Sequence, residues 1–275
     1  MKKKLMALVM TACMAATMLT GCGSSAGSAK DTYTVGICQL VQHPALDAAT
    51  QGFKDALTEK LGDKVKFNEQ NASGESATCS TIVNQFVSSG VDLILANATA
   101  PLQSAAAATN TIPILGTSVT DYATALDISD WNGTTGVNIS GTSDLAPLAE
   151  QAAMLKELFP DAQNVAMLYC SAEPNSEYQV RIVTEELEKL GMTCKNYSFA
   201  DTNDIASVVT NAVSECDVIY IPTDNTAASS TSVIDNVCRP AGVPVIAGEE
   251  GICKGCGVAT LSISYYDIGY ETGLM

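Results

Sequence analysis

The chain is 275 residues long, 47% apolar, and carries a formal net charge of −16 at pH 7. A chain of this length and apolar content can form one large domain or two lobes with packed cores. Because a surface this acidic repels polyanions, we exclude nucleic acid and anionic lipid headgroups as partners of the folded part.

The first 22 residues are predicted to be a lipoprotein signal peptide. Lysines at residues 2–4 precede an uncharged apolar run that is too short to span a bilayer and that ends in Leu19-Thr20-Gly21-Cys22. Small residues before a cysteine match the bacterial lipobox, in which the cysteine takes the lipid. We therefore expect lipidation of Cys22 and an extracytoplasmic position on the outer face of the cell membrane. An ordinary cleaved signal with an incidental cysteine is the alternative.

Residues 23–31 are small and polar without periodicity, which is typical of a flexible linker. Short apolar runs and longer amphipathic stretches then alternate. In this first block the predicted strands are residues 32–38, 64–69, 92–96 and 112–115, and the predicted helices are residues 45–61, 76–89 and 101–109. Glycine follows two of the helices, at Gly62 and Gly90. The rhythm predicts a parallel sheet covered by helices on both faces.

The rhythm pauses at residues 121–135, which contain turn residues and no clean period. After it come a short extended segment and a second block. The expected strands are residues 136–139, 164–169, 193–199, 217–221, 243–246 and 258–263, and the expected helices are residues 144–159, 176–190, 204–214, 226–239 and 266–275. Because the last helix reaches the final residue without a terminator, we expect the sequence to lack its C-terminal end.

The fold class that this pattern predicts is α/β, with two Rossmann-like lobes built on parallel sheets. We expect lobe 1 to comprise residues 32–138, completed by residues 260–275, and lobe 2 to comprise residues 139–259. Ligands of open parallel sheets bind beyond the carboxyl ends of the strands. We therefore expect a ligand cleft between the two lobes.

Cys253 and Cys256 form the one close pair of cysteines in the predicted folded part. A local disulfide, a redox motif and half of a metal site are the possible interpretations. A metal site is disfavoured because there is no second C-x-x-C and His43 is the only histidine. A redox pair normally opens a helix, whereas the surrounding glycines predict a turn here. Structural thiols or a local disulfide remain the favoured reading.

Seven short motifs follow predicted strands or lie in the last helix. They are QHPALD at residues 42–47, NATA at 97–100, GTSVTD at 116–121, EPNS at 173–176, DNT at 224–226, GEEG at 248–251 and YYDIGYETG at 265–273. With these motifs in this order, the chain resembles the type I periplasmic binding proteins. More narrowly, it resembles the ABC transporter substrate-binding proteins that include receptors for tryptophan and other aromatic amino acids. The resemblance runs from about residue 34 to the end, and the Cys253/Cys256 pair departs from it.

The resemblance implies a monomeric receptor that captures a small molecule, foremost an aromatic amino acid, and delivers it to the permease and ATPase of an ABC importer. It implies attachment to the membrane through the lipid only, and no catalytic residue, cofactor or metal. The candidate ligand-binding residues are Gln42, His43, Asn97, Thr99, Thr117, Ser118, Glu173, Asn175, Ser176, Asp224, Asn225 and Glu249.

An amino acid has two charged groups, a carboxylate and an ammonium, and each needs polar partners in such a cleft. Thr99, Thr117 and Ser118 of the first lobe would meet its carboxylate at helix starts. Asp224 and Glu249 of the second lobe would meet its ammonium through charge-assisted hydrogen bonds. Contacts split across two lobes would favour the closed form.

The same residue types are ordinary helix caps and turn residues, so capping is the alternative at each position. It is the first expectation for Asp144 and Ser176. Candidate walls for an aromatic side chain are Tyr122, Trp131 and Tyr178, each of which packing would also explain.

Two other functions remain open. The first is a binding protein for a sugar or nucleoside, although Arg181 and Arg239 are the only arginines and neither follows a strand. The second is a thiol-dependent enzyme, which would need a reactive cysteine near the single histidine. The sequence contains no phosphate-binding G-x-x-x-x-G-K-[ST] loop, no G-x-G-x-x-G after its first strand and no G-x-S-x-G elbow. We therefore expect no enzyme.

Overall fold

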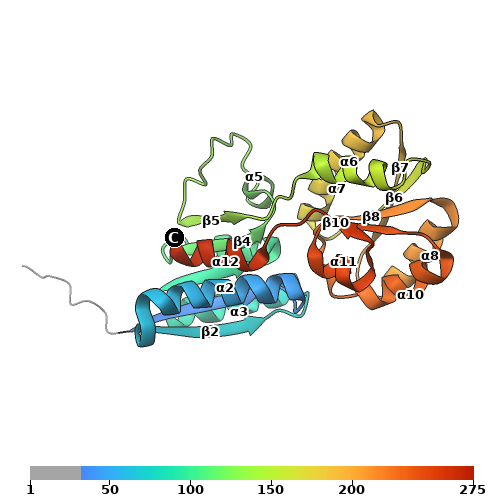
Figure 1. The fold of residues 1–275 in the computed structure, drawn as a ribbon. Helices are drawn as coiled ribbons and strands as arrows, with labels where there is room; N and C mark the ends of the chain where they lie inside the picture. Colours follow the sequence, from blue (N-terminus) through green and yellow to red (C-terminus); the bar gives the residue numbers. More distant parts are fainter. Residues whose placement is uncertain (1–31) are drawn as a thin grey trace, which may run out of the picture. The chain divides into compact units, whose positions relative to one another are not determined.

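The computed structural model describes residues 32–275, so the predicted signal peptide, linker and lipidation site lie outside the described residues. The described part contains two five-stranded parallel sheets, as predicted (Figure 1). The first has the order β2-β1-β3-β4-β5, with β1 (Tyr33–Gln39), β2 (Val65–Asn71), β3 (Leu93–Asn97), β4 (Ile114–Val119) and β5 (Ile139–Ser143). The second has the order β10-β9-β8-β6-β7, with β6 (Asn164–Cys170), β7 (Thr193–Phe199), β8 (Val218–Ile221), β9 (Val245–Ala247) and β10 (Ala259–Thr260). We call each sheet with its helices the first and the second lobe.

Helices cover both faces of each sheet. The first lobe has α2 (Pro44–Leu61), the short 3-10 helix η1 (Gly62–Lys64), α3 (Ser76–Ser89), α4 (Thr99–Ala108), α5 (Tyr122–Ala125) and α12 (Tyr265–Leu274). The second has α6 (Leu148–Leu158), α7 (Pro174–Lys189), α8 (Ile205–Glu215), α9 (Asn225–Ala228), α10 (Thr231–Ala241) and α11 (Glu250–Cys256). No helix among residues 32–275 is long and apolar enough to cross a membrane.

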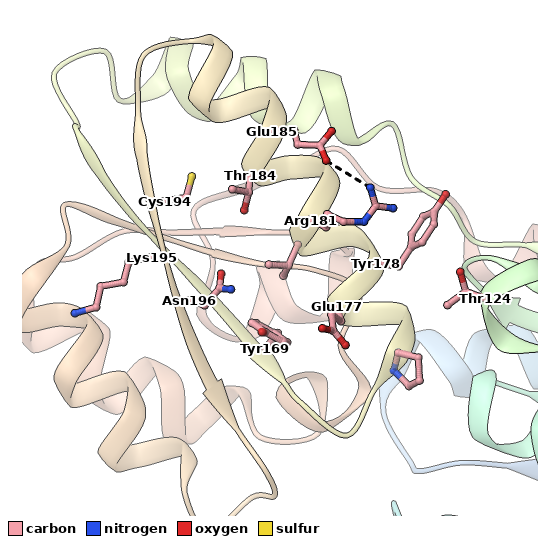
Figure 2. A pocket seen from close by; sticks show the side chains of 12 residues that line it. Thr124, Tyr169, Glu177, Tyr178, Arg181, Thr184, Glu185, Cys194, Lys195 and Asn196 are labelled. Atoms are coloured by element: carbon pink, nitrogen blue, oxygen red, sulfur yellow. Dashed lines mark hydrogen bonds and ion pairs between the residues drawn. The ribbon is translucent and has the colours of Figure 1, made fainter. Parts of the chain in front are cut away.

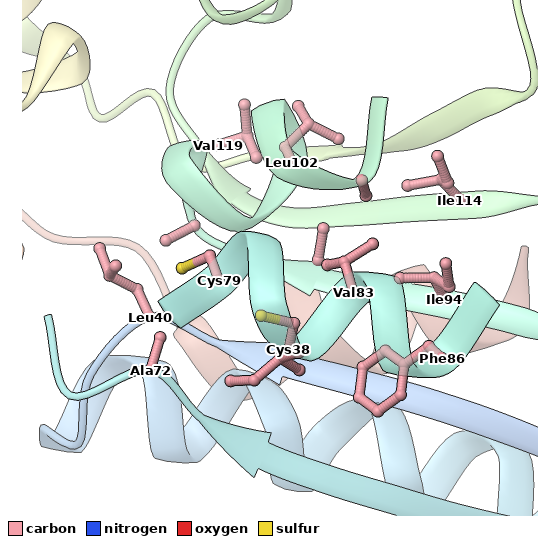
Figure 3. Packing of buried hydrophobic residues seen from close by; sticks show 14 of the residues in the cluster. Cys38, Leu40, Ala72, Cys79, Val83, Phe86, Ile94, Leu102, Ile114 and Val119 are labelled. Carbon is pink, nitrogen blue, oxygen red and sulfur yellow. The ribbon is translucent and has the colours of Figure 1, made fainter. Parts of the chain in front are cut away.

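Alternation along β1 explains how the first sheet is buried on both sides. Val35 and Ile37 pack with Phe53 of α2, whereas Cys38 lies in the opposite cluster with α3 and α4 (Figure 3). A side chain at Gly36 would overlap the ring of Phe86, so this strand position must stay bare for α3 to pack. A parallel sheet in an α/β fold is covered by helices on both faces, so it needs buried apolar side chains on both faces.

The C-terminal helix α12 packs beside α2 in the first lobe (Figure 1). The two backbones approach closely because Gly52 and Gly269 face the partner helix, and a Cβ at either position would overlap the other helix's backbone. Thr272 also hydrogen-bonds Thr142 of β5, with 2.7 Å between the hydroxyl oxygens. The end of the chain therefore forms part of the first lobe.

The structure corrects the predicted lobe boundaries. Residues 139–143 form β5, which pairs with β4 and belongs to the first sheet rather than to the second lobe. Near the C-terminal end, Thr260 was assigned to the first lobe, but it pairs with Ala247 and so belongs to the second sheet. The chain therefore changes lobe at residues 144–147 and again at residues 261–264.

Two local predictions are also wrong. The single helix expected at residues 226–239 is divided into α9 and α10 by Ser229 and Ser230. The turn expected around Cys253 and Cys256 is a helix, α11, because the Glu249 carboxylate accepts the N–H groups of its first turn. Both cysteines are free thiols.

Candidate functional site

Side chains of the two lobes meet at the carboxyl ends of the strands. His43 Nε2, at the start of α2, lies 3.1 Å from Asn225 Oδ1 at the start of α9. Gln179 of α7 donates to Thr120, which follows β4, at 3.2 Å. The contact of His43 with Asn225 borders a small cavity of about 10 Å³, here called the interlobe pocket, whose polar lining includes His43, Ser118, Asp144, Thr223, Glu249 and Tyr265.

Two buried polar atoms of the pocket residues have no hydrogen-bond partner. They are Nδ1 of His43 and Oγ of Ser118. Because buried polar groups are nearly always hydrogen-bonded, each position requires an explanation. Ser118 also has a φ of 55°, and Ala98, after the neighbouring strand, a φ of 107°. Non-glycine residues in this region are strained, and such strain clusters at ligand-binding sites.

Two buried carboxylates face the same pocket. Asp144 is 4% exposed and accepts hydrogen bonds from the hydroxyls of Thr120 and Tyr265, each at 2.9 Å. Burial raises the pKa of Asp144 above its ordinary value, the two hydroxyls lower it, and the nearby charge of Glu249 raises it. Glu249 is 2% exposed and accepts the backbone N–H groups of Gly251 and Ile252. Neither lysine nor arginine lines this pocket in the described chain, so a cationic group would offset the cost of burying the two acids.

Asp224 also lines the pocket but is already well bonded. Its Oδ1 accepts the N–H of Ala227 at 2.8 Å, and its Oδ2 accepts the N–H of Cys170 and the hydroxyl of Ser176 at 2.6 and 2.8 Å. Burial, followed by the charge of Glu173, raises the pKa of Asp224 to about 7. Asp224 therefore ties β6, α7 and α9 together. Ser176 is not an N-cap as expected, because α7 begins at Pro174.

Glu173 binds mainly the first turn of α9. Its carboxylate accepts hydrogen bonds from the backbone and side chains of Asn225 and Thr226, and from Asn175 Nδ2 at 3.1 Å. Asn175 also lines the interlobe pocket. The EPNS and DNT motifs are therefore brought together beside the interlobe pocket.

The other predicted residues lie around the pocket without lining it. Asn97 is buried, donates to the Leu46 carbonyl at 2.8 Å, and leaves its Oδ1 without a partner. Thr99 and Thr117 are also buried, whereas Gln42 is exposed.

The proposed aromatic walls lie elsewhere in the structure. Tyr122 donates to the Thr142 carbonyl within the first lobe, and Trp131 is 43% exposed. Tyr178 stacks beside Arg181. None of the three lines the interlobe pocket.

Three polar pocket residues were missed by reasoning from the sequence, as were the apolar Leu46 and Ala228. Asp144 was expected to cap the following helix, but α6 begins only at Leu148 and the carboxylate turns to Thr120 and Tyr265. Thr223 and Tyr265 lie within or beside recognised motifs but were not chosen. Asp144 directly follows β5, but the sequence placed the end of that strand at residue 139 and so hid this signal.

Besides a hollow of about 260 Å³ that shares Glu249 and Tyr265 with the interlobe pocket, two further hollows bear on where the ligand lies. One, of about 340 Å³, opens between the lobes beside the interlobe pocket and is lined by Val41 and Ala100 of the first lobe and by Cys170 and Glu173 of the second. The other, of about 780 Å³, lies along α7 and β7 (Figure 2). Its charged side chains are exposed and Arg181 already pairs with Glu185 at 3.5 Å, so we place the ligand between the lobes.

The two parallel-sheet lobes, the first with the strand order β2-β1-β3-β4-β5, have the type I periplasmic binding protein fold, which solved structures of similar fold share. The chain belongs to the family of ABC transporter substrate binding proteins, whose model matches residues 34–275. That family consists of binding proteins and not of enzymes.

Individual relatives cover most of the chain. It is 34% identical to a curated tyrosine-binding protein of Clostridioides difficile (strain R20291), over 98% of this chain and 82% of that one. The solved ABC domain from Streptococcus pneumonia in complex with L-Trp is 32% identical, with a TM-score of 0.85 over 89% of this chain and 83% of that chain. A ligand-free, open substrate binding protein with adhesive properties from Clostridium difficile is 34% identical, with a TM-score of 0.60 over 88% and 83% of the two chains.

Proposed function

We propose that this protein is the lipid-anchored, extracytoplasmic receptor of an ABC importer that captures an aromatic amino acid between its lobes. It then delivers the amino acid to the permease and ATPase. Binding proteins of this family act outside the cytoplasm, and the lipobox at Cys22 supports the anchor.

The observation that carries the proposal is the polar composition of the interlobe pocket. The carboxylates of Asp144 and Glu249 offer acceptors to an ammonium group. The unpartnered hydroxyl of Ser118 offers a donor to a carboxylate. The pocket itself measures about 10 Å³ and no lysine or arginine lines it, so its side chains would meet the charged groups of an amino acid whose remaining atoms lie outside this pocket.

The relatives support an aromatic side chain, because relatives at 34 and 32% identity are named for tyrosine binding and solved with L-Trp. The hollow of about 340 Å³ beside the pocket lies within the size range of small-molecule sites, about 300–1,000 Å³, and so supports a small molecule of any class.

A closed arrangement of the lobes is consistent with this assignment. The fold matches the L-Trp complex with a TM-score of 0.85 and the open, ligand-free relative with 0.60, although the identities are similar at 32 and 34%. The hydrogen bonds from His43 and Gln179 join the lobes in the same arrangement. Ligand contacts on both lobes would stabilise this closed form.

Isothermal titration calorimetry of the mature protein tests the proposal. Tyrosine, tryptophan and phenylalanine are compared with tyramine, which lacks the carboxylate, and with N-acetyltyrosine, whose amino group is neutral. We expect an aromatic amino acid to bind and both analogues to bind at least tenfold more weakly. Ser118→Ala should weaken binding, whereas the control Ser88→Ala, at an exposed α3 position, should not. Binding of sugars or nucleosides alone would overturn the amino acid assignment.

A further inference from the structure

His43 is the only histidine of the chain, and it bridges the lobes. Its Nε2 lies 3.1 Å from Asn225 Oδ1, and its Nδ1 is buried without a partner. One ring nitrogen therefore serves the contact between the lobes, and the other belongs to a residue that lines the ligand pocket.

The orientation of the Asn225 side chain fixes the proton on the imidazole. Asn225 Nδ2 lies 2.7 Å from Glu173 Oε2, and an ionised carboxylate can only accept hydrogen bonds. The amide nitrogen must therefore face Glu173, which leaves the amide oxygen facing His43. Since that oxygen can only accept, the Nε2 of His43 must carry the hydrogen.

Glu173 is well suited to hold this orientation. Besides Asn225 Nδ2, its two oxygens accept from the backbone N–H groups of Asn225 and Thr226 at 3.1 and 2.9 Å and from the Thr226 hydroxyl at 2.8 Å. Every one of these groups is a donor, so the oxygens of Glu173 act only as acceptors in this arrangement. Glu173 and Asn225 are thus positioning residues for the imidazole.

We propose that His43 binds the ligand's ammonium group through an unprotonated Nδ1 and thereby couples ligand capture to lobe closure. In the neutral ring with hydrogen on Nε2, Nδ1 is an acceptor, and an ammonium group is purely a donor. The carboxylates of Asp144 and Glu249 line the same pocket and favour the same cation. The inference rests on the proposed amino acid ligand, and it identifies the charged amino group as the feature that the closing lobe recognises.

A consequence concerns substrate class. An α-keto acid with the same aromatic side chain has no donor to give to Nδ1, so it would leave this nitrogen unpaired and two carboxylates facing a carbonyl oxygen. Sites that hydrogen-bond a substrate group strongly reject analogues lacking it. We expect replacement of the amino acid by its keto acid to weaken binding more than replacement of one aromatic ring by another.

Because the chain has a single histidine, nitrogen-15 NMR of the mature protein, purified without a histidine tag, reads this ring without assignment. With saturating tyrosine or tryptophan at pH 7.5, we expect the chemical shift of Nε2 to be that of a protonated, pyrrole-type nitrogen. The chemical shift of Nδ1 should be that of an unprotonated nitrogen that accepts a hydrogen bond. A hydrogen on Nδ1, or a doubly protonated ring, in the saturated complex would overturn the inference. Absence of binding by any amino acid would instead overturn the proposed function, and calorimetry separates the two failures.

Matched variants test the two ring nitrogens separately. His43→Gln places an amide N–H near the position of Nε2 and so retains a donor for Asn225, but it has no counterpart of Nδ1. Loss of a hydrogen bond to a charged group predicts about a tenfold or greater rise in the dissociation constant. His43→Ala should lose both contacts and bind still more weakly, while Gln51→Ala, at an exposed position of the same helix α2, serves as control. Wild-type affinity in a folded His43→Gln protein would contradict the role of Nδ1.

Discussion

Replacing Asp144 by asparagine should have opposite effects on stability and on binding. The change preserves size and hydrogen-bonding capacity, because the new amide oxygen can accept from Thr120 and the amide nitrogen can donate to the Tyr265 oxygen. Burial raises the pKa of Asp144, which means that its charge is unfavourable in the folded protein at neutral pH. Removing that charge should therefore raise the melting temperature of the ligand-free protein.

Binding should weaken in the same variant, because the ligand's ammonium loses a charged partner. A hydrogen bond to a charged group contributes about 1.5–3 kcal/mol, which corresponds to a rise of about 10- to 150-fold in the dissociation constant. Thermal melting and isothermal titration calorimetry at pH 7.5 measure the two effects on one preparation. Glu157→Gln removes an equal charge from an exposed position of α6 and should change neither. An Asp144→Asn protein that binds the amino acid within twofold of wild type would refute the assignment of Asp144 to the ammonium.

Three further predictions concern the folded chain. Folded Asp224 has a pKa of about 7 against an ordinary 3.8, so the folded state holds this proton more tightly; its contribution to stability is fully present below pH 4 and is lost as the pH rises to 7. Urea midpoints should fall over that interval more steeply than in Asp224→Asn, and equal slopes would contradict the shift. Gly269→Ala should lower the free energy of unfolding by about 1–3 kcal/mol, because the new Cβ would overlap the α2 backbone. The control Ser88→Ala should melt as wild type does. An unchanged melting temperature for Gly269→Ala would show that the two helices can separate freely. Burial raises the pKa of the Cys170 thiol to about 11, so alkylation at pH 8, followed by mass spectrometry, should be slow in the native protein and fast in urea; rapid native labelling would show that this part of β6 opens.

The alternation of strands and helices was predictable because each element carries its own signal. Apolar runs of strand length, amphipathic stretches and terminal glycines such as Gly90 are local features. The lobe to which β5 belongs was not predictable in the same way. Its five residues show that they are extended, but only the pairing of Ile139 with Ile114 assigns them to the first sheet.

The helix that contains Cys253 and Cys256 shows a different limit. The glycines of α11 have a low intrinsic helix propensity and therefore predict a turn, but this preference is a weak signal in a segment of seven residues. A capping carboxylate at Glu249 and the complete burial of Ile252 outweigh that preference. Tertiary packing thus decided an element whose local sequence was ambiguous.

The candidate site could be predicted as a set of strand ends but not as a set of contacts. Reasoning from the sequence identified His43, Ser118 and Glu249, and in the structure these three residues line one pocket. It assigned Asp144 to capping because the partner that orients the carboxylate, Tyr265, lies 121 residues further along the chain. Asp144 and Asp224 both line the pocket and both accept hydrogen bonds from groups far away in the sequence, Asp144 from Thr120 and Tyr265 and Asp224 from Cys170 and Ser176, so neither environment could be deduced locally.

The interlobe pocket combines features that each disfavour the ligand-free protein. Asp144 and Glu249 are buried acids without a cation in the pocket, His43 and Ser118 hold unpartnered polar atoms, and Ser118 is in a strained conformation. An open form would expose these groups to water and remove much of the cost, whereas an amino acid would remove it by supplying one cation, one anion and the missing hydrogen bonds. A binding protein whose pocket were satisfied by its own residues would close without ligand. The unsatisfied groups therefore make closure depend on capture, which is the coupling that a transport receptor requires.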